Sequence, residues 1–306
     1  MEYRGFGAKI SDGEQSGVEI TVAFSDEIQP VEEQKRRFCI GAGTFAGIFD
    51  GLGPNGGQAA SEVANYCNKE MSAIDVENGE IVHMVDDVRA YLRSILWDAD
   101  TALNSTYNRG AEYPETGVNA ALAHVVRNTE ESESKRVLVV GCVGDCVVLR
   151  RRDEGSKSRV EQINIVEHRD LWRIAQEDEG AARYLQGKMF NMRDPTAPHH
   201  SKHLKSLYGG LNARQPSLGA TPSYRKDMPK INVHMYEAND VHAGDQVLLL
   251  TSGFRTLTGK CIEDTWNNTQ QTNNTALALT EEVCRKNAQK DPRAVHSDVA
   301  VIHMKF

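Results

Sequence analysis

The stretch from Thr44 to Gly53, TFAGIFDGLG, constrains the fold of this 306-residue chain more than any other. An apolar run that is too short for a helix and bounded by glycines predicts a buried strand. Asp50 lies where this run meets a glycine-rich turn, and a buried carboxylate is unfavourable unless a partner neutralises it or hydrogen-bonds to it. A bound cation would supply that partner, and so would an Asx-type turn onto the amides that follow. Spacing alone favours the turn, and the cation stays open as the alternative.

Composition and charge exclude several classes of function. With 40% hydrophobic and 25% charged residues, the chain has the composition of an ordinary globular protein. The net charge of -8 argues against nucleic acid or an anionic membrane as the main partner. The sequence has no apolar run of about 18 residues that would span a bilayer, and its first ten residues lack a signal-peptide core. Six scattered cysteines without a C-x-x-C pair predict free thiols in the cytoplasm or another reducing compartment.

The hydrophobic periodicity changes along the chain. Apolar residues at three- and four-residue steps predict two long helices between residues 57 and 106. From residue 117 the period is two, and the tight Val143-Gly144-Asp145 turn predicts a hairpin between two of the following strands. Strands are predicted at 18–24, 118–126, 136–142, 146–151, 160–166, 231–236, 247–252 and 297–306, and further helices at 171–186 and 277–290. We therefore predict a single α+β domain over 1–306, with two packed antiparallel sheets and helices outside.

The least regular part of the sequence is residues 187–227. It is too long for a plain connection, so we expect a flap-like insert within the domain, and it is a candidate partner-binding surface. His199, His200 and His203 fall within it, and two of these imidazoles could share one side of a helical turn as transition-metal ligands. Because the segment is polar and flanked by prolines, surface histidines are the preferred interpretation.

The order of these pieces resembles the metal-dependent type 2C serine/threonine protein phosphatases along nearly the whole chain. Five motifs carry the resemblance, each weak alone but all in the family's order. They are Phe49 to Gly53 for F-D-G-H-G, Gly141 to Cys146 for A-N-V-G-D-S, Glu167-His168 for D-H, Leu248 to Phe254 for L-I-L-A-S/T-D-G-L, and Ser297 to Ile302 for D-N-I-T-V-I. The resemblance implies a sandwich of two antiparallel sheets flanked by helix pairs.

The resemblance also implies a centre of two Mg²⁺ or Mn²⁺ ions bridged by carboxylates. Such ions lower the pKa of a bound water, which attacks phosphorus, and they need several, largely anionic, oxygen ligands. The opening Y-G…G of the family is similar to Phe6-Gly7 to Gly13 and sets a register without gaps. In that register the phosphate-binding arginine falls on Gln15, which cannot make the bidentate contact. The acidic pair of the next strand falls on Glu19 and Ile20, so one carboxylate is kept.

The remaining positions of the implied centre are mostly neutral. The bridging aspartate is kept as Asp50, with the backbone carbonyl of Gly51 beside it, and Asp145 is also kept. The histidine that serves as general acid is replaced by Leu52, which has no proton to donate. The residual metal set is therefore Asp50, Gly51, Asp145 and Glu19, and we expect no cofactor.

Two further ligand positions carry hydroxyls in place of acids. The aspartates of the last two motifs fall on Ser252 and Ser297, which cannot balance the charge of two divalent ions in a protein interior. Asp298 could replace Ser297 if the last strand slipped by one residue. Such a slip would exchange the strand's inner and outer faces, so it is not expected.

Two functions follow from the resemblance. The first is a pseudophosphatase, a catalytically inactive relative that binds a protein partner such as a phosphoprotein. The second is an active Mg²⁺- or Mn²⁺-dependent serine/threonine phosphatase with a reduced or rebuilt metal centre around Asp50, Glu19 and Asp145. Joint loss of the arginine, the proton donor and most anionic ligands favours the first. The sequence does not determine the partner or the oligomeric state.

Overall fold

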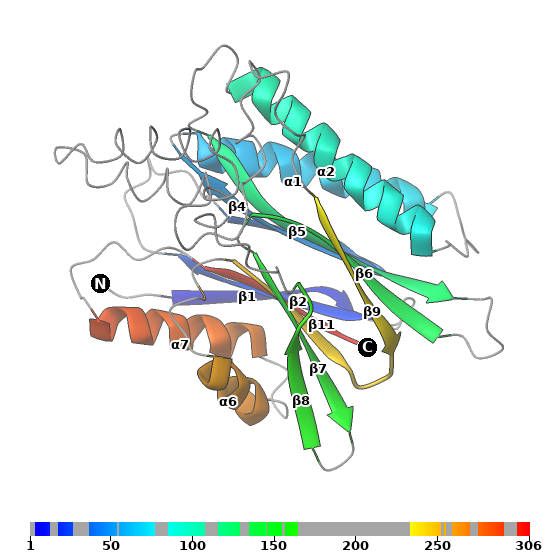
Figure 1. The fold of residues 1–306 in the computed structure, drawn as a ribbon. Helices are drawn as coiled ribbons and strands as arrows, with labels where there is room; N and C mark the ends of the chain where they lie inside the picture. Colours follow the sequence, from blue (N-terminus) through cyan, green and yellow to red (C-terminus); the bar gives the residue numbers. More distant parts are fainter. Residues whose placement is uncertain are drawn as a thin grey trace, which may run out of the picture.

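The fold consists of four stacked layers: a helix pair, two antiparallel sheets and a second helix pair (Figure 1). It was obtained as a computed structural model. The structure describes residues 4–12, 18–26, 37–53, 55–76, 85–107, 116–128, 135–144, 146–154, 157–164, 233–251, 254, 259–269, 275–290 and 299–306. The predicted α+β sandwich of two antiparallel sheets flanked by helix pairs is confirmed.

A five-stranded antiparallel sheet carries the Asp50 strand. Its strands are, in spatial order, β3 (Arg37–Ala42), β4 (Phe45–Leu52), β5 (Gly117–Asn128), β6 (Lys135–Val143) and β9 (His234–Val241). Helices α1 (Gly56–Val76) and α2 (Val85–Tyr107) cover its outer face, as their apolar stripes predict. β4 is buried along its whole length, which confirms the buried strand predicted for this stretch.

The second sheet has six antiparallel strands. They are, in spatial order, β1 (Arg4–Asp12), β2 (Glu19–Asp26), β11 (Ala300–Lys305), β10 (Gln246–Leu250), β7 (Val147–Glu154) and β8 (Lys157–Gln162). Helices α6 (Gly259–Thr269) and α7 (Thr275–Lys290) cover its outer face. None of the helices in the described ranges combines the length and the apolar character needed to cross a membrane.

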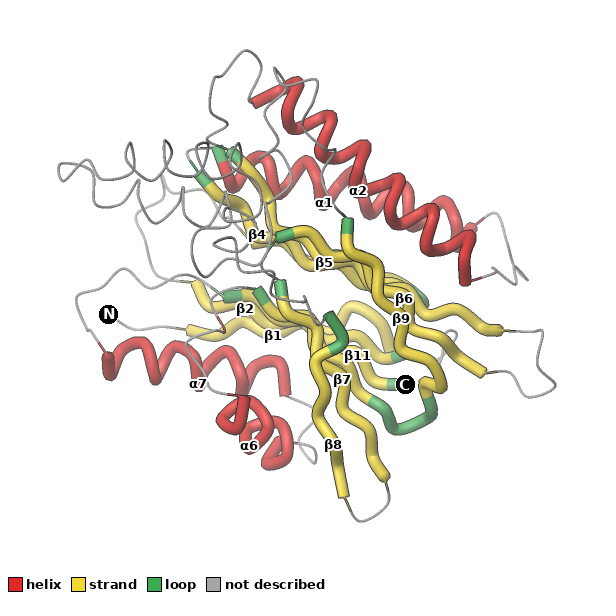
Figure 2. The backbone as a smooth tube through the Cα atoms, in the orientation of Figure 1, coloured by secondary structure: helices red, strands yellow, loops and turns green. Residues whose placement is uncertain are grey.

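Figure 2 shows the helices and sheets stacked in succession, and three apolar layers, each a cluster of buried side chains, lie between them. The outer layers lie between each sheet and its helix pair, and the central layer lies between the sheets. Because successive strand residues point to opposite faces, each central strand supplies two layers. In β4, for example, Phe45 and Phe49 pack toward α1 and α2, whereas Ala46 and Ile48 pack between the sheets.

The predicted hairpin at Gly144 is wrong in its pairing, although the tight turn exists. β6 belongs to the five-stranded sheet and β7 to the six-stranded sheet, so the turn carries the chain from one sheet to the other. Gly144 has a φ of +77°, which a glycine adopts without strain. Cys142 and Cys146, on either side of the turn, both contribute to the core between the sheets. Stacking buries both faces of each strand, which side-by-side pairing would not do.

The cysteines are free thiols, as predicted, and all six lie in the described part of the chain. Cys142 and Cys146 are buried without forming a disulfide across the turn. Burial raises the pKa of Cys142 to about 12, so this thiol is unreactive at neutral pH.

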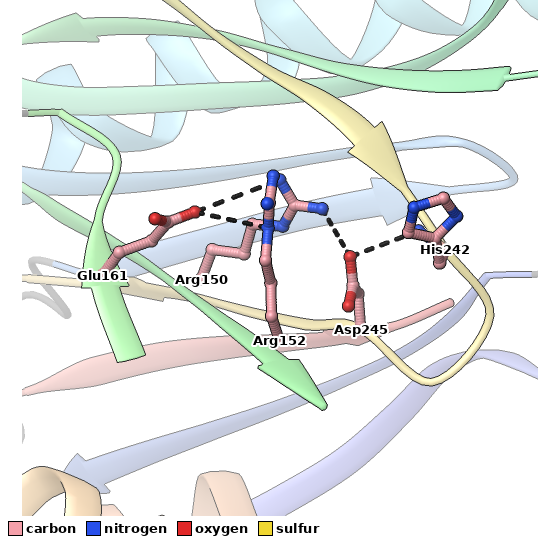
Figure 3. A network of polar contacts seen from close by, with 5 residues as sticks. All are labelled: Arg150, Arg152, Glu161, His242 and Asp245. Carbon is pink, nitrogen blue, oxygen red and sulfur yellow. Dashed lines mark hydrogen bonds and ion pairs between the residues drawn. The ribbon is translucent and has the colours of Figure 1, made fainter. Parts of the chain in front are cut away.

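Charged residues hold the connection between β9 and β10, where the chain crosses between the sheets (Figure 3). The fully buried Arg150 donates a hydrogen bond of 2.5 Å to Oδ2 of Asp245. The same oxygen accepts the backbone N–H of His242 at 3.2 Å. Glu161 lies 4.0 Å from Arg150 and 3.6 Å from Arg152. The network therefore ties this connection to β7 and β8.

Several predicted features lie outside the described residues. They are the helix at 171–186, the insert at 187–227 with His199, His200 and His203, and the Glu167-His168 motif. These features stay predictions.

Candidate functional site

One end of the sandwich gathers the described parts of four motifs that the sequence singled out, which begin at Phe49, Gly141, Leu248 and Ser297. Asp50 is the register partner of Asn119 on β5, and the neighbouring end of β5 reaches the turn at Gly144 through β6. That turn enters the other sheet at the first residue of β7. In the second sheet, strand pairing places four residues side by side at this same end: Val147, Leu250, Val301 and Ala23. We call this the Asp50 end.

Asp50 and Asn119 point into the space between the two sheets. Asp50 follows Ala46 and Ile48 at two-residue steps, and both of these pack between the sheets. Asn119 precedes Ala121, which packs in the same layer. Asp50 and Asn119 are both 0% exposed. A carboxylate and an amide therefore lie side by side in the interior, where each needs hydrogen bonds or a compensating charge.

Two glycines let the backbone close tightly over the Asp50 end. A Cβ on Gly51 would lie 1.9 Å from the carbonyl oxygen of Gly56, the first residue of α1. A Cβ on Gly144 would lie 2.0 Å from Oδ1 of Asn119. The strand therefore touches the start of α1 directly, and the turn between the sheets rests on the side chain of Asn119. Asp50 itself lies within β4, which runs on to Leu52, and the turn follows at Gly53 with a φ of +84°.

The ends of β10 and β11 are joined beside the Ser252 motif. The hydroxyl of Thr251 accepts the backbone N–H of Ala300 at 3.0 Å, and the N–H of Thr251 donates to the carbonyl of Ala300 at 3.1 Å. Thr251 is completely buried. Ser252 and Ser297 themselves lie outside the described residues, as do Gln15 and Asp145.

The sequence did not single out Asn164, which organises the turn at this end. Its Oδ1 accepts the backbone N–H of Val148 at 2.8 Å, and its Nδ2 donates to the carbonyl of Cys146 at 2.7 Å. The amide side chain therefore imitates one residue of a pairing strand at the start of β7. No local pattern marks such a role, because it depends on where the end of β8 meets β7.

Glu19 is not brought to Asp50. It pairs with Lys305, at the end of β11 remote from Ala300, whereas Phe24 pairs with Ala300. Phe24 lies five positions after Glu19, which corresponds to about 17 Å along a strand. The register counted without gaps from the N-terminal motif therefore fails for Glu19, because pairing with β11 sets the position of β2. A register shift between Lys9 and Ser11 also interrupts that counting.

The two apolar replacements are both in the interior. Ile20 is fully buried in the core between the sheets, and Leu52 is 6% exposed at the end of β4. The backbone of Asp26, the last residue of β2, lies at the Asp50 end, beyond the pairing of Phe24 with Ala300. Asp26 was not a candidate in the sequence, because the register counted from Phe6 assigned the acidic pair to Glu19 and Ile20, which precede it in β2.

The described residues do not fit a centre of two divalent ions. Among the residues whose side chains the structure describes, the oxygen donors at the Asp50 end include the Asp50 carboxylate, the Asn119 amide and the Thr251 hydroxyl, with the Gly51 backbone carbonyl beside them. Hard dications require mainly anionic oxygens to offset their dehydration. Within the described ranges, no three histidine, cysteine, aspartate or glutamate residues are grouped closely enough to hold a metal. We therefore derive no metal-dependent step from this site.

Comparisons with known proteins give a likeness of fold. Neither the family models nor the curated proteins include a match to this chain. Among solved structures, the *Mycobacterium smegmatis* PPM Ser-Thr phosphatase MsPP, in complex with cacodylate, has a TM-score of 0.53 and 17% identity, covering 94% of this chain and 97% of that chain. The catalytic domain of the phosphatase PstP, in complex with two manganese ions, has a TM-score of 0.55 and 14% identity, covering 99% and 97%.

A third similar structure is a protein described as a key regulatory component of T6SS. It is PppA of the *Pseudomonas aeruginosa* T6SS, with a TM-score of 0.55 and 12% identity, covering 100% of this chain and 98% of that chain. At these identities the likeness concerns the architecture of sheets and helices. The chain therefore adopts the fold of the PPM-family, type 2C-like, serine/threonine phosphatases.

Proposed function

We propose that this protein is a pseudophosphatase, a catalytically silent protein with a type 2C phosphatase fold that acts by binding a protein partner such as a phosphoprotein. The observation that carries the proposal is the chemistry of the Asp50 end. Leu52 stands where the family resemblance implies a proton donor, and Asn119 is the buried neighbour of Asp50. Neither side chain can supply a proton or a negative charge.

The intact core supports the same proposal. β4 is buried throughout, and the layers on both sides of it are filled by apolar side chains. The sequence therefore retains what the fold requires while the chemical groups implied by the resemblance have changed. A fold kept in this way can still present a binding surface, since fold and chemistry are separable.

Phosphopeptide turnover with added Mn²⁺ tests the proposal. We expect no release of phosphate above that of Asp50→Ala, because Leu52 stands where the resemblance implies the general acid. Asp98→Ala is the matched control, since Asp98 is an exposed carboxylate on α2, away from the Asp50 end. Metal-dependent turnover that is abolished by Asp50→Ala and kept in Asp98→Ala would refute catalytic silence and support a rebuilt Mg²⁺ or Mn²⁺ centre around Asp50 and Asp145.

Binding is measured separately from turnover. Calorimetric titration with Mn²⁺ is expected to give no heat beyond dilution. Fluorescence anisotropy with a phosphoserine peptide pool and the same pool unphosphorylated, both without metal, tests the phosphoprotein partner. Equal affinity for both pools would argue against recognition of phosphate.

A further inference from the structure

A polar cluster lies on the outer face of the six-stranded sheet, where α6 covers it. Its centre is His303 on β11, which is 1% exposed. Trp266 of α6 packs edge-on against the His303 ring, with ring centroids 6.1 Å apart at an angle of 89°. Gln246 at the start of β10 and Thr21 on β2 complete the cluster. These residues take no part in the Asp50 end.

The hydrogen bonds of the cluster determine which nitrogen of His303 carries the proton. The indole N–H of Trp266 can only donate, so the Gln246 atom at 2.7 Å is an acceptor, Oε1. The same oxygen lies 3.0 Å from Nε2 of His303. A carbonyl oxygen has no proton to give, so Nε2 must donate. Neutral His303 is therefore the Nε2–H tautomer, and its lone pair is on Nδ1.

Two buried polar atoms of the cluster remain. Within the described residues, neither Nδ1 of His303 nor Oγ1 of Thr21 has a hydrogen-bond partner. The two residues are direct register partners on neighbouring strands. Their side chains share the outer face, with Cβ atoms about 5 Å apart in such a pair. Buried polar groups of native proteins are almost always hydrogen-bonded, so these two atoms point to one shared ligand.

The surroundings select a neutral hydrogen-bond donor as that ligand. Burial is the main cause that lowers the pKa of His303 to about 3, and the positive charges of Lys305 and Arg151 lower it further. The same positive potential disfavours a metal cation on Nδ1. A water molecule is neutral, can donate to Nδ1 and can exchange a hydrogen bond with a hydroxyl. Internal waters typically bridge two to four such groups.

We propose that one internal water molecule belongs to this cluster, donating to Nδ1 of His303 and hydrogen-bonded to Oγ1 of Thr21. A hydrogen-bonded chain then runs from Trp266 through Gln246, His303 and the water to Thr21. It links α6 to β10, β11 and β2, and so fastens the helix across three adjacent strands.

Nuclear magnetic resonance of the intact wild-type protein at pH 7 tests both parts of the proposal. Long-range ¹H–¹⁵N correlation is expected to show His303 protonated on Nε2, and cross-relaxation is expected to connect the His303 ring to a long-lived water. An Nδ1–H tautomer would overturn the proposal. So would a direct bond from the Thr21 hydroxyl to Nδ1 without a water contact.

Two substitutions at Thr21 provide a second test. Thr21→Ser keeps the hydroxyl and is expected to keep the water signal, whereas Thr21→Val removes the hydroxyl and is expected to lose it. Thr280→Val is the matched control, because the buried Thr280 hydroxyl donates to the Ala276 carbonyl within α7. That control should leave the His303 signals unchanged. A water signal that persists in Thr21→Val would show that Thr21 does not hold the water. If Thr21→Val does not fold, the wild-type and Thr21→Ser spectra still decide the question.

Discussion

Acidification is expected to destabilise this protein through His303. The folded protein holds this histidine neutral, with a pKa of about 3, because it is buried and lies near Lys305 and Arg151. In the unfolded chain the pKa returns to about 6.5. The unfolded state therefore binds a proton first as the pH falls. The stability contributed by neutral His303 is complete above pH 6.5 and is lost progressively between pH 6.5 and 3.

The size of the effect follows from the two pKa values. At about 1.36 kcal/mol for each pKa unit, the full difference corresponds to about 5 kcal/mol of unfolding free energy. At pH 4.5, two units below the unfolded value, the expected loss is about 2.7 kcal/mol. A typical domain has a total stability of about 5–15 kcal/mol, so a loss of this size is large enough to measure by unfolding.

Urea unfolding of wild type and His303→Gln at pH 7.5, 6, 5 and 4.5 measures this contribution. Glutamine does not titrate, and its amide can still donate to Gln246. The stability of wild type relative to the variant should fall by about 2.7 kcal/mol between pH 7.5 and 4.5. His242→Gln is the control, since His242 is exposed and lies outside the His303 cluster. A wild-type advantage over His303→Gln that stays constant with pH would refute the reasoning.

Three further substitutions are expected to lower the stability of the protein, by more where the altered group is buried than where it is exposed. Asp245→Asn removes the carboxylate that is hydrogen-bonded to the buried Arg150 and leaves Glu161 at 4.0 Å, so it should lower the unfolding free energy by about 3–5 kcal/mol in urea. Glu282→Gln breaks the half-exposed pair with Arg285 and should cost less than about 1 kcal/mol, so equal losses would contradict this contrast. Gly144→Ala is expected to lower the unfolding free energy by at least about 1–2 kcal/mol, because φ is +77° at this position and a Cβ would overlap with the side chain of Asn119. An unchanged melting temperature would argue against that strain.

Strands and helices were predictable wherever their buried face produces a regular spacing of apolar residues in the sequence. Most of the strands and helices that line the three apolar layers repeat at two or at three to four residues, and these were found. The elements that were not predicted include β1 and α6. β1 contains two glycines, and α6 runs into a segment rich in threonine and asparagine, so neither has a strong intrinsic preference. Tertiary contacts decide both, as the fully buried Trp266 shows for α6.

The turn at Gly144 shows where local patterns stop being informative. Its residues predict a sharp reversal, and Gly144 adopts the positive φ that suits a tight turn. Whether the two strands then pair side by side or stack face to face depends on what covers their other faces. α2 covers β6 and α6 lies over the sheet that contains β7, information that is absent from the turn itself.

The two acidic positions of the candidate site differ in the same way. Asp50 was placed correctly in the core because its own apolar run carries it there. Glu19 was placed by counting from a distant turn, and pairing of β2 with β11 puts it at the opposite end. The backbone of Asp26 lies at the Asp50 end instead. If calorimetry detects a cation at Asp50, Asp50→Asn should therefore weaken its binding, while Glu19→Gln should leave the affinity unchanged. A loss of affinity in Glu19→Gln would show that the register of β2 does not decide which carboxylate serves the site.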